Sequence, residues 1–188
     1  MIEIIVLAFV FVIALVINKG VSGIKSKEVR AVYLIFVGFL IQLLIFNEKF
    51  SNSPFSSATP IFYVISLFIL LAFLLLNLHY RGILISMVGF SLNLLVILAN
   101  KGFMPQDLSK LELVGAHTKI VLLQQYGTFY NATIMSEKTH LNFLGDNITA
   151  QLLNPFVGVY SIGDIIILLG LCVFIFEFLK KPASFKLS

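Results

Sequence analysis

The chain has 188 residues, of which 59% are hydrophobic and 12% are charged, and its formal net charge is +4. Soluble domains carry roughly 25% charged residues, and a single soluble core of this size could not bury so much apolar surface. The basic residues flank apolar runs and form no stripe with stacking aromatics, so nucleic acid is excluded as a partner. The composition predicts an integral membrane protein whose first partner is the lipid bilayer.

Five segments approach the length of roughly 20 apolar residues that a membrane-crossing helix needs. They are residues 4–18, 31–47, 60–79, 82–100 and 161–179. The first segment resembles a signal peptide in position, but basic residues follow it and none precedes it, so we expect an uncleaved span. The predicted fold is an all-α, polytopic membrane helix bundle with four spans in residues 1–100, an extramembrane part at 101–160, and a last span with a tail at 161–188.

Basic residues distribute unevenly between the two sides of the predicted bundle, and such asymmetry sets topology. One side, which includes the C-terminal tail, holds eight of them: Lys19, Lys25, Lys27, Arg30, Arg81, Lys180, Lys181 and Lys186. The other side holds five: Lys49, Lys101, Lys110, Lys119 and Lys138. The bias predicts a multi-pass plasma-membrane protein with its N-terminus outside and its C-terminus in the cytoplasm.

Residues 101–160 are the one sizeable extramembrane segment of this prediction. They are rich in leucine, isoleucine, valine and aromatic residues and are not of low complexity. A floating loop of that composition would expose much apolar surface. We therefore expect a folded extracytoplasmic cap of short helices and turns, packed on the outer ends of the spans or lying in the interface.

The fourth span carries Gly89, Asn93 and Asn100 at spacings of four and seven, so the three share one helix face. That face is expected to turn toward protein, because an amide facing hydrocarbon leaves its donors unmet. Two interpretations remain open. The face is either a contact between helices, with small residues and cross-linking amides, or the polar lining of a site.

Two similar segments, Phe143-Leu144-Gly145-Asp146 and Ser161-Ile162-Gly163-Asp164, each place an aspartate after a glycine. Ser161 and Asp164 have the spacing of a capping box, with Ser161 as N-cap and Asp164 in the first turn of the last span. Asp146 or Asn147 is expected to cap a short helix through Leu153 in the same way.

The alternative is a site at the outer face. Asn93, Asn100, Asp146, Ser161 and Asp164 all fall near the outer ends of the last two spans or in the segment between them. Two carboxylates brought together there could share a proton, hold a cation or act as an acid–base pair. Asp146 and Asp164 are then the candidate catalytic residues, and the whole set is a candidate ligand-binding or structural polar cluster.

The remaining chemistry-bearing residues indicate neither a metal site nor a cofactor. The single cysteine, Cys172, excludes an intrachain disulfide and a thiolate cage. His117 and His140 lie far apart without a partnering motif, and His79 has an ordinary interfacial position. No P-loop, dinucleotide fingerprint or nucleophile elbow is present.

The polar residues of the last two spans carry a family resemblance. The string Asn93-x6-Asn100-x-Gly102-x-Met104-Pro105, followed by the two Gly-Asp segments, resembles the DUF5317 family of bacterial integral membrane proteins. The resemblance implies a bacterial inner-membrane location and leaves the function open. A second likeness is to lipoprotein signal peptidases, which pair aspartates at the outer ends of their last two spans. Asp164 matches the second position, whereas Asn100 stands at the first.

Two function classes follow. The first is a non-enzymatic membrane subunit or assembly partner, which binds another membrane protein or a second copy of itself through its outer segment. The alternative is a small-ligand or ion-binding protein, or an intramembrane hydrolase, that uses the Asn/Asp cluster.

Overall fold

A computed structural model describes residues 28–149 and 158–179 of the chain. The predicted first span at 4–18 and the predicted tail lie outside these residues. The described part is mostly helical. In chain order its helices are α2 (Tyr33–Ile45), α3 (Glu48–Ser51), η2 (Ser56–Ala58), α4 (Thr59–Leu76), α5 (Arg81–Ala99), α6 (Leu108–Leu113), α7 (His117–Tyr126), η3 (Asn142–Leu144) and α8 (Ile162–Leu179).

Three helical segments among the described residues are long and apolar enough to cross a membrane: Ser56–Leu76, Arg81–Ala99 and Ile162–Leu179. Their bounds lie close to three of the five segments that hydropathy predicts. Pro60 lies in the first turn of α4, where its missing N–H costs no hydrogen bond. The predicted span at 31–47 is shorter in the structure, because α2 has 13 residues and rises only about 20 Å.

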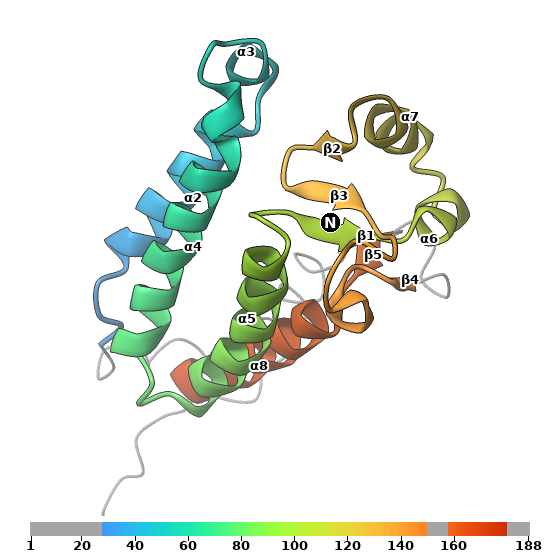
Figure 1. The fold of residues 1–188 in the computed structure, drawn as a ribbon. Coiled ribbons are helices and arrows are strands. Elements are labelled where there is room, and N and C mark those ends of the chain that lie inside the picture. Colours follow the sequence, from blue (N-terminus) through green and yellow to red (C-terminus); the bar gives the residue numbers. More distant parts are fainter. Residues whose placement is uncertain (1–27, 150–157, 180–188) are drawn as a thin grey trace, which may run out of the picture.

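Helices α2 and α4 lie side by side (Figure 1), and partly buried polar contacts join the two helices and the residues that flank them. Gln42 on α2 donates from Nε2 to Oγ of Ser66 on α4 at 3.0 Å. Below α4, the fully buried Asn77 accepts from the backbone N–H of Arg30 at 2.8 Å and donates to the carbonyl of Arg30 at 2.9 Å. These bonds satisfy polar groups that would otherwise be buried without partners.

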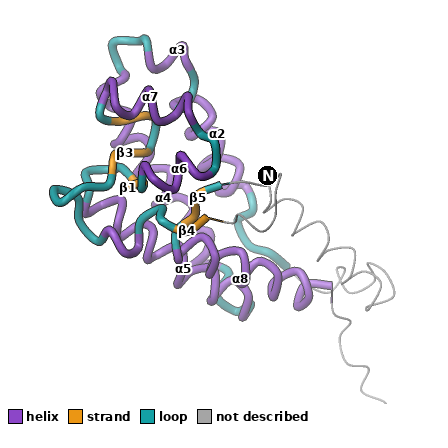
Figure 2. Tube along the Cα trace, turned by 90° about the vertical axis from the view of Figure 1, so that its right-hand side faces the viewer, coloured by secondary structure: helices purple, strands orange, loops and turns teal. Residues whose placement is uncertain are grey.

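Helices α5 and α8 run side by side, and they do so in both views of the molecule (Figures 1 and 2). Residue contacts run in opposite directions along the two helices, since Gly82 near the start of α5 meets Phe174 late in α8 and Gly89 meets Gly163. The pair is therefore antiparallel. Because α5 ends where residues 101–160 begin and α8 starts where they end, both ends of that segment are attached at one end of this pair.

Residues 101–149 and 158–160 form a cap that mixes helices with short strands, so the expectation of an all-α fold is wrong for this part. Its strands are β1 (Met104–Gln106), β2 (Thr128–Phe129), β3 (Ala132–Ile134), β4 (Ile148–Thr149) and β5 (Val159–Tyr160). Strand β3 pairs parallel with β1 and antiparallel with β2, while β4 and β5 pair antiparallel. A parallel bridge between Gln106 and Asp146 joins the two groups of strands.

The largest apolar core lies where the cap meets the helices. It contains buried residues of α2, α4 and α5 and two from the cap: Ile45, Tyr63, Leu67, Leu94, Val96, Ile97, Met104 and Leu144. A smaller core inside the cap consists of Leu111, Leu123 and Ala132. The cap is thus packed on the helices and has apolar contacts of its own, as the composition of 101–160 predicts.

Candidate functional site

The α5–α8 contact positions the first group of candidate residues, and glycines make that contact close. A Cβ at Gly89 would meet the carbonyl oxygen of Gly163 and would lie 2.9 Å from the backbone nitrogen of Ile167. A Cβ at Gly170 would lie 2.6 Å from the carbonyl oxygen of Gly82. Backbone thus touches backbone, which only small residues permit.

Asn93, Ser161 and Asp164 form one hydrogen-bonded cluster at the end of this contact. Asn93 donates from Nδ2 to Oδ1 of Asp164 at 2.7 Å and accepts at Oδ1 from the hydroxyl of Ser161 at 2.8 Å. Ser161 is fully buried. The cluster links the two helices, since Asn93 belongs to α5 and the other two residues begin α8.

The same cluster contains the capping box that the sequence predicts. The backbone N–H of Ser161 donates to Oδ2 of Asp164 at 3.0 Å, and the N–H of Asp164 donates to Oγ of Ser161 at 2.9 Å. The carboxylate also lies in the first turn of α8, where the helix dipole favours negative charge. Every side-chain oxygen of the three residues therefore has a partner inside the cluster.

Asn100 lies apart from this cluster and holds the cap. Its Oδ1 accepts from the backbone N–H of His140 at 2.8 Å, and its Nδ2 donates to the carbonyl of His140 at 2.9 Å. Nδ2 also donates to the carbonyl of Val96, in the last turn of α5, at 2.8 Å. Lys101 and Gly102 then take left-handed backbone angles, with φ of 58° and 95°. The Asn100 side chain thus links the end of α5 to the cap through hydrogen bonds.

Asp146 lies in the bridge that joins the strands of the cap. Its N–H donates to the carbonyl of Pro105 at 2.9 Å and its carbonyl accepts from the N–H of Asp107 at 3.0 Å. Residues 148–149 continue as β4. The expectation that Asp146 or Asn147 caps a helix starting here is therefore wrong, because the backbone of Asp146 pairs with a strand 40 residues earlier.

The carboxylate of Asp146 is buried against Gln106, a residue that the sequence analysis did not single out. Gln106 donates from Nε2 to Oδ2 of Asp146 at 2.6 Å, and the two residues are only 6% and 8% exposed. The other amide atom, Oε1 of Gln106, is buried and has no hydrogen-bond partner in the described part of the chain. Buried polar atoms are nearly always paired, so this oxygen is an exception that calls for a donor.

Burial raises the pKa of Asp146 from its ordinary 3.8 to about 7, and the negative charge of Asp164 acts in the same direction. The hydrogen bond from Gln106 and the charge of Lys119 oppose this shift. Burial also lowers the pKa of Lys119, while the charge of Asp146 opposes that shift. Asp146 therefore changes its charge near neutral pH, and Lys119 is the cation whose charge acts on it.

The structure brings some of the predicted residues together and separates others. Asn93, Ser161 and Asp164 share one cluster, Asp146 pairs with Gln106, and Asn100 binds the backbone of His140. The two aspartates interact through their charges, although each has its own hydrogen-bond partners. Among the described residues, no group of three or more His, Cys, Asp or Glu side chains has an arrangement suited to a metal ion.

Sequence reasoning singled out Gly89 but missed Gln106, Lys119 and the other three glycines of the helix contact, Gly82, Gly163 and Gly170. Nothing in the local sequence marks Gln106 or Lys119, because each acts only through a residue distant in the chain. The glycines do leave a signal: Gly82 and Gly89 are seven residues apart, and so are Gly163 and Gly170. Seven residues are close to two helical turns, so each pair lies on one face.

These features define a mostly helical protein with three helices that could cross a membrane and a mixed α/β cap over the ends of two of them. The model of a family of unknown function, DUF5317, matches residues 26–176, and the chain belongs to that family. Comparisons with curated proteins and with solved structures gave no match.

Proposed function

We propose that the chain is a non-enzymatic membrane subunit or assembly partner, in which the α5–α8 pair is a rigid support for the cap. The observation that carries this proposal is the closed Asn93–Ser161–Asp164 cluster. Its carboxylate, hydroxyl and amide are all used in bonds to one another, and Ser161 is fully buried. Each side-chain oxygen of the cluster already has a partner within it, which supports a role in joining the two helices.

The proposed topology has five spans: the segment at 4–18, a span built on α2 with its flanking residues, and the three long helices. The cap faces the outside and the C-terminus the cytoplasm of a bacterial cell. A single cysteine placed at the exposed Ser109, in a Cys172→Ser background, tests this arrangement. Labelling of intact cells by a membrane-impermeant maleimide is expected. Labelling only after the inner face is opened reverses the orientation.

The cap surface formed by α6 and α7 is the proposed contact with another membrane protein or with a second copy. Leu113 and Val121 are 57% and 58% exposed there and do not belong to the apolar core of the cap. Exposed apolar side chains of this kind are typical of association surfaces.

The test is a comparison of matched variants after purification in a mild detergent. We expect the unmodified chain to run as a defined complex, and Leu113→Glu or Val121→Glu to release the partner while the fold is kept. Lys138→Glu, a change on the same cap at an exposed position, is the control and should leave the complex intact. A complex that survives both apolar-to-glutamate changes, or one that Lys138→Glu disrupts equally, contradicts the proposal.

A second candidate function, binding of a small cation, is favoured by one specific observation. The unpartnered Oε1 of Gln106 lies on the same amide that holds the Asp146 carboxylate, so two oxygen ligands are close together and one lacks a donor. Thermal unfolding at pH 8 in sodium, potassium, magnesium or choline chloride tests this candidate. A binding cation raises the midpoint of the native chain and leaves that of Asp146→Asn unchanged. Equal midpoints in all four salts reject it.

A further inference from the structure

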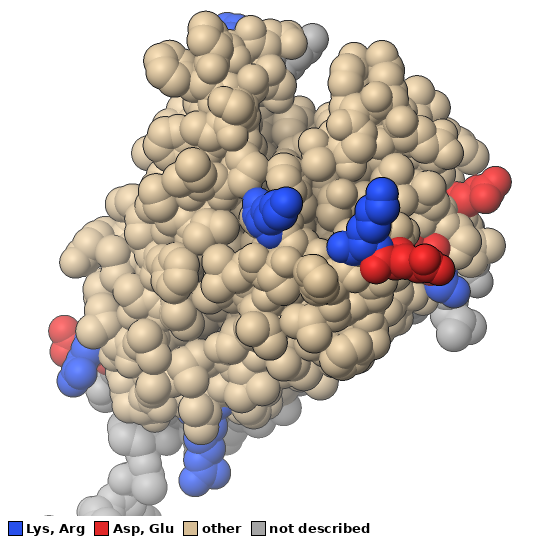
Figure 3. Space-filling view, in the orientation of Figure 1, with Lys and Arg blue, Asp and Glu red and all other residues tan. Residues whose placement is uncertain are grey.

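A groove separates the cap from the region where α4 begins. It has a volume of about 640 Å³ and lies between residues 51–60 on one side and Phe103, α7 and β2 on the other. The space-filling view shows the surface hollowed between these two lobes (Figure 3). The volume is within the range of small-molecule sites, roughly 300–1,000 Å³. None of the cluster residues discussed above lines it.

One wall of the groove carries small, neutral polar side chains. It is formed by Ser51, Asn52, Ser56, Ser57 and Thr59. Thr59 donates its hydroxyl to the carbonyl of Ser56 at 2.7 Å. The side chains of the other four form no hydrogen bond within the described part of the chain, so their donors and acceptors are open to a ligand.

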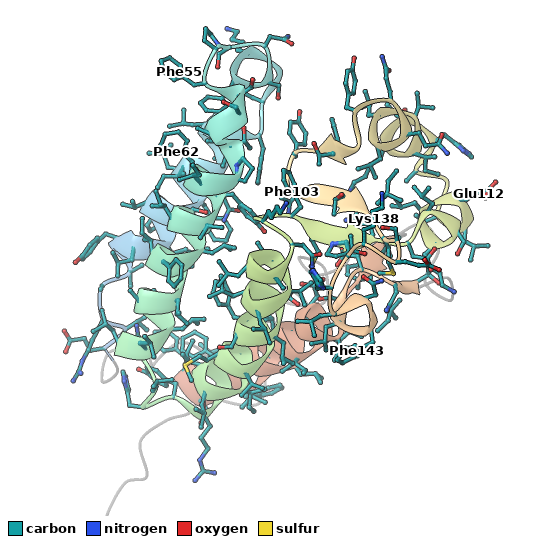
Figure 4. All side chains as sticks on the ribbon, in the orientation of Figure 1. Phe55, Phe62, Phe103, Glu112, Lys138 and Phe143 are labelled. Atoms are coloured by element: carbon teal, nitrogen blue, oxygen red, sulfur yellow. The ribbon has the colours of Figure 1, made fainter. Side chains whose placement is uncertain are left out.

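The opposite wall is aromatic and consists of Phe103, Tyr126, Phe129 and Tyr130. The rings of Phe129 and Tyr130 lie 4.2 Å apart between centroids, and Phe46 supports Tyr130 from behind at 5.6 Å. Tyr130 has a left-handed backbone with φ of 54°, a conformation that is costly for a bulky residue. Phe103 lies between α4 and β1, whereas Phe143 lies on another part of the cap (Figure 4).

Charge is missing from both walls. Of the described residues that line the groove, none is Lys, Arg, Asp, Glu or His. A charged ligand would find no counter-charge on these walls, so the lining favours a neutral ligand. A matching ligand is neutral, has hydroxyl groups along one edge and an apolar face on the other side. A sugar ring has this character, because its axial C–H groups form an apolar face that stacks on aromatic rings.

The position of the groove indicates where such a ring would come from. Its polar wall includes the start of the apolar segment Ser56–Leu76, so the groove lies at the end of a candidate span, where lipid headgroups are found. We propose that this groove binds a neutral sugar ring, either as the headgroup of a glycosylated lipid or as a free saccharide. This proposal is independent of the subunit role, which concerns the α6–α7 surface.

The chain has no tryptophan, so Phe129→Trp introduces a single reporter in the groove and keeps an aromatic ring there. The full chain in phosphatidylcholine nanodiscs is titrated with glucosyl diacylglycerol in one arm and with maltose in the other. We expect a saturable change in tryptophan emission. A response to the glycolipid alone assigns the lipid source, and a response to both assigns the sugar itself.

Two variants and one control decide the site. Phe103→Ala removes a stacking ring and Ser57→Val removes a hydroxyl at an exposed position that tolerates the change. Each is expected to weaken binding roughly threefold to tenfold. Phe143→Ala removes a 65% exposed ring outside the groove and should leave binding unchanged.

Three results overturn the proposal. The first is the lack of a saturable response to both probes in a chain whose circular dichroism shows a native fold. The second is an equal response to phosphatidylglycerol, which has no sugar ring. The third is a loss of affinity in Phe143→Ala as large as that in Phe103→Ala.

Discussion

The α5–α8 contact holds a half-buried carboxylate, that of Asp164, and the Gln106–Asp146 contact holds a buried one, and the two are bonded differently. Asp164 has both oxygens bonded and lies at a helix N-terminus, whereas Asp146 receives one bond from an amide whose other atom has no partner. The first arrangement gives both carboxylate oxygens a partner and joins two helices. The second opposes a charge and leaves a proton or a cation to balance it. The difference separates a structural aspartate from one that can respond to its surroundings.

The largest expected effect concerns pH. The folded-state pKa of Asp146, about 7, lies above its ordinary 3.8, so the folded chain binds this proton more tightly than the unfolded chain. Its stabilising contribution is complete below about pH 4 and is lost as pH rises through about 7. Since one pKa unit corresponds to about 1.4 kcal/mol, the loss reaches about 4 kcal/mol at most.

Asp146→Asn keeps an acceptor for Gln106 and removes the titration. We expect the free energy of unfolding of the native chain, relative to this variant, to fall between pH 5 and pH 8. Denaturant unfolding in detergent at several pH values measures it. Asp107→Asn is the matched control, because hydrogen bonds from Ser109 lower the pKa of Asp107, whose contribution is then lost only in acid. A difference between the native chain and Asp146→Asn that does not change with pH would show that the pKa of Asp146 is not raised in the folded chain.

The next effect tests how tightly α5 and α8 are packed. Gly89→Ala places a Cβ against the backbone of Gly163 and Ile167, so the helices must separate. We expect a loss of about 3 kcal/mol in stability. Gly38→Ala is the control, because its Cβ meets mainly the flexible end of the Leu70 side chain, 2.8 Å away. Similar midpoints for both variants in thermal unfolding would mean that the α5–α8 backbone contact is not close.

The smallest effect concerns the hydrogen bonds of the closed cluster. Asn93→Ala leaves one oxygen of Asp164 without its donor and the hydroxyl of Ser161 without its acceptor. The expected cost is about 1–2 kcal/mol. Ser91→Ala, an exposed change on the same helix, should cost much less. If the two variants unfold at the same denaturant concentration, the cluster adds nothing to stability.

Local patterns in the sequence predict the long helices and the capping box of Ser161 and Asp164, because apolar length and a three-residue spacing decide them. They do not predict the strands of the cap. Strand β1 contains Pro105 and has only three residues, and its partners come from residues 132–134 and 146. Pairing between residues this distant is set by the packed fold and leaves no local periodicity.

In the candidate site, too, local spacing predicts some contacts and not those between residues distant in the chain. The face shared by Gly89 and Asn93 is visible in the spacing, and the structure places it against α8. The pairing of Asp146 with Gln106 is not visible in the sequence, because the two residues are 40 apart and the sequence does not predict the strand that contains Gln106. Asn100 was expected in the cluster, but it faces the backbone of His140.

The order of the chain has a consequence for biosynthesis. The residues that pack on the glycine face of α5 begin at Ser161, and the whole cap is translated after α5 and before Ser161. A nascent chain therefore carries the glycine face and the Asn93 amide uncovered until α8 emerges from the ribosome. Premature termination anywhere in the cap produces a polypeptide that lacks α8 and leaves this face of α5 uncovered. Such a polypeptide is a substrate for quality-control proteases.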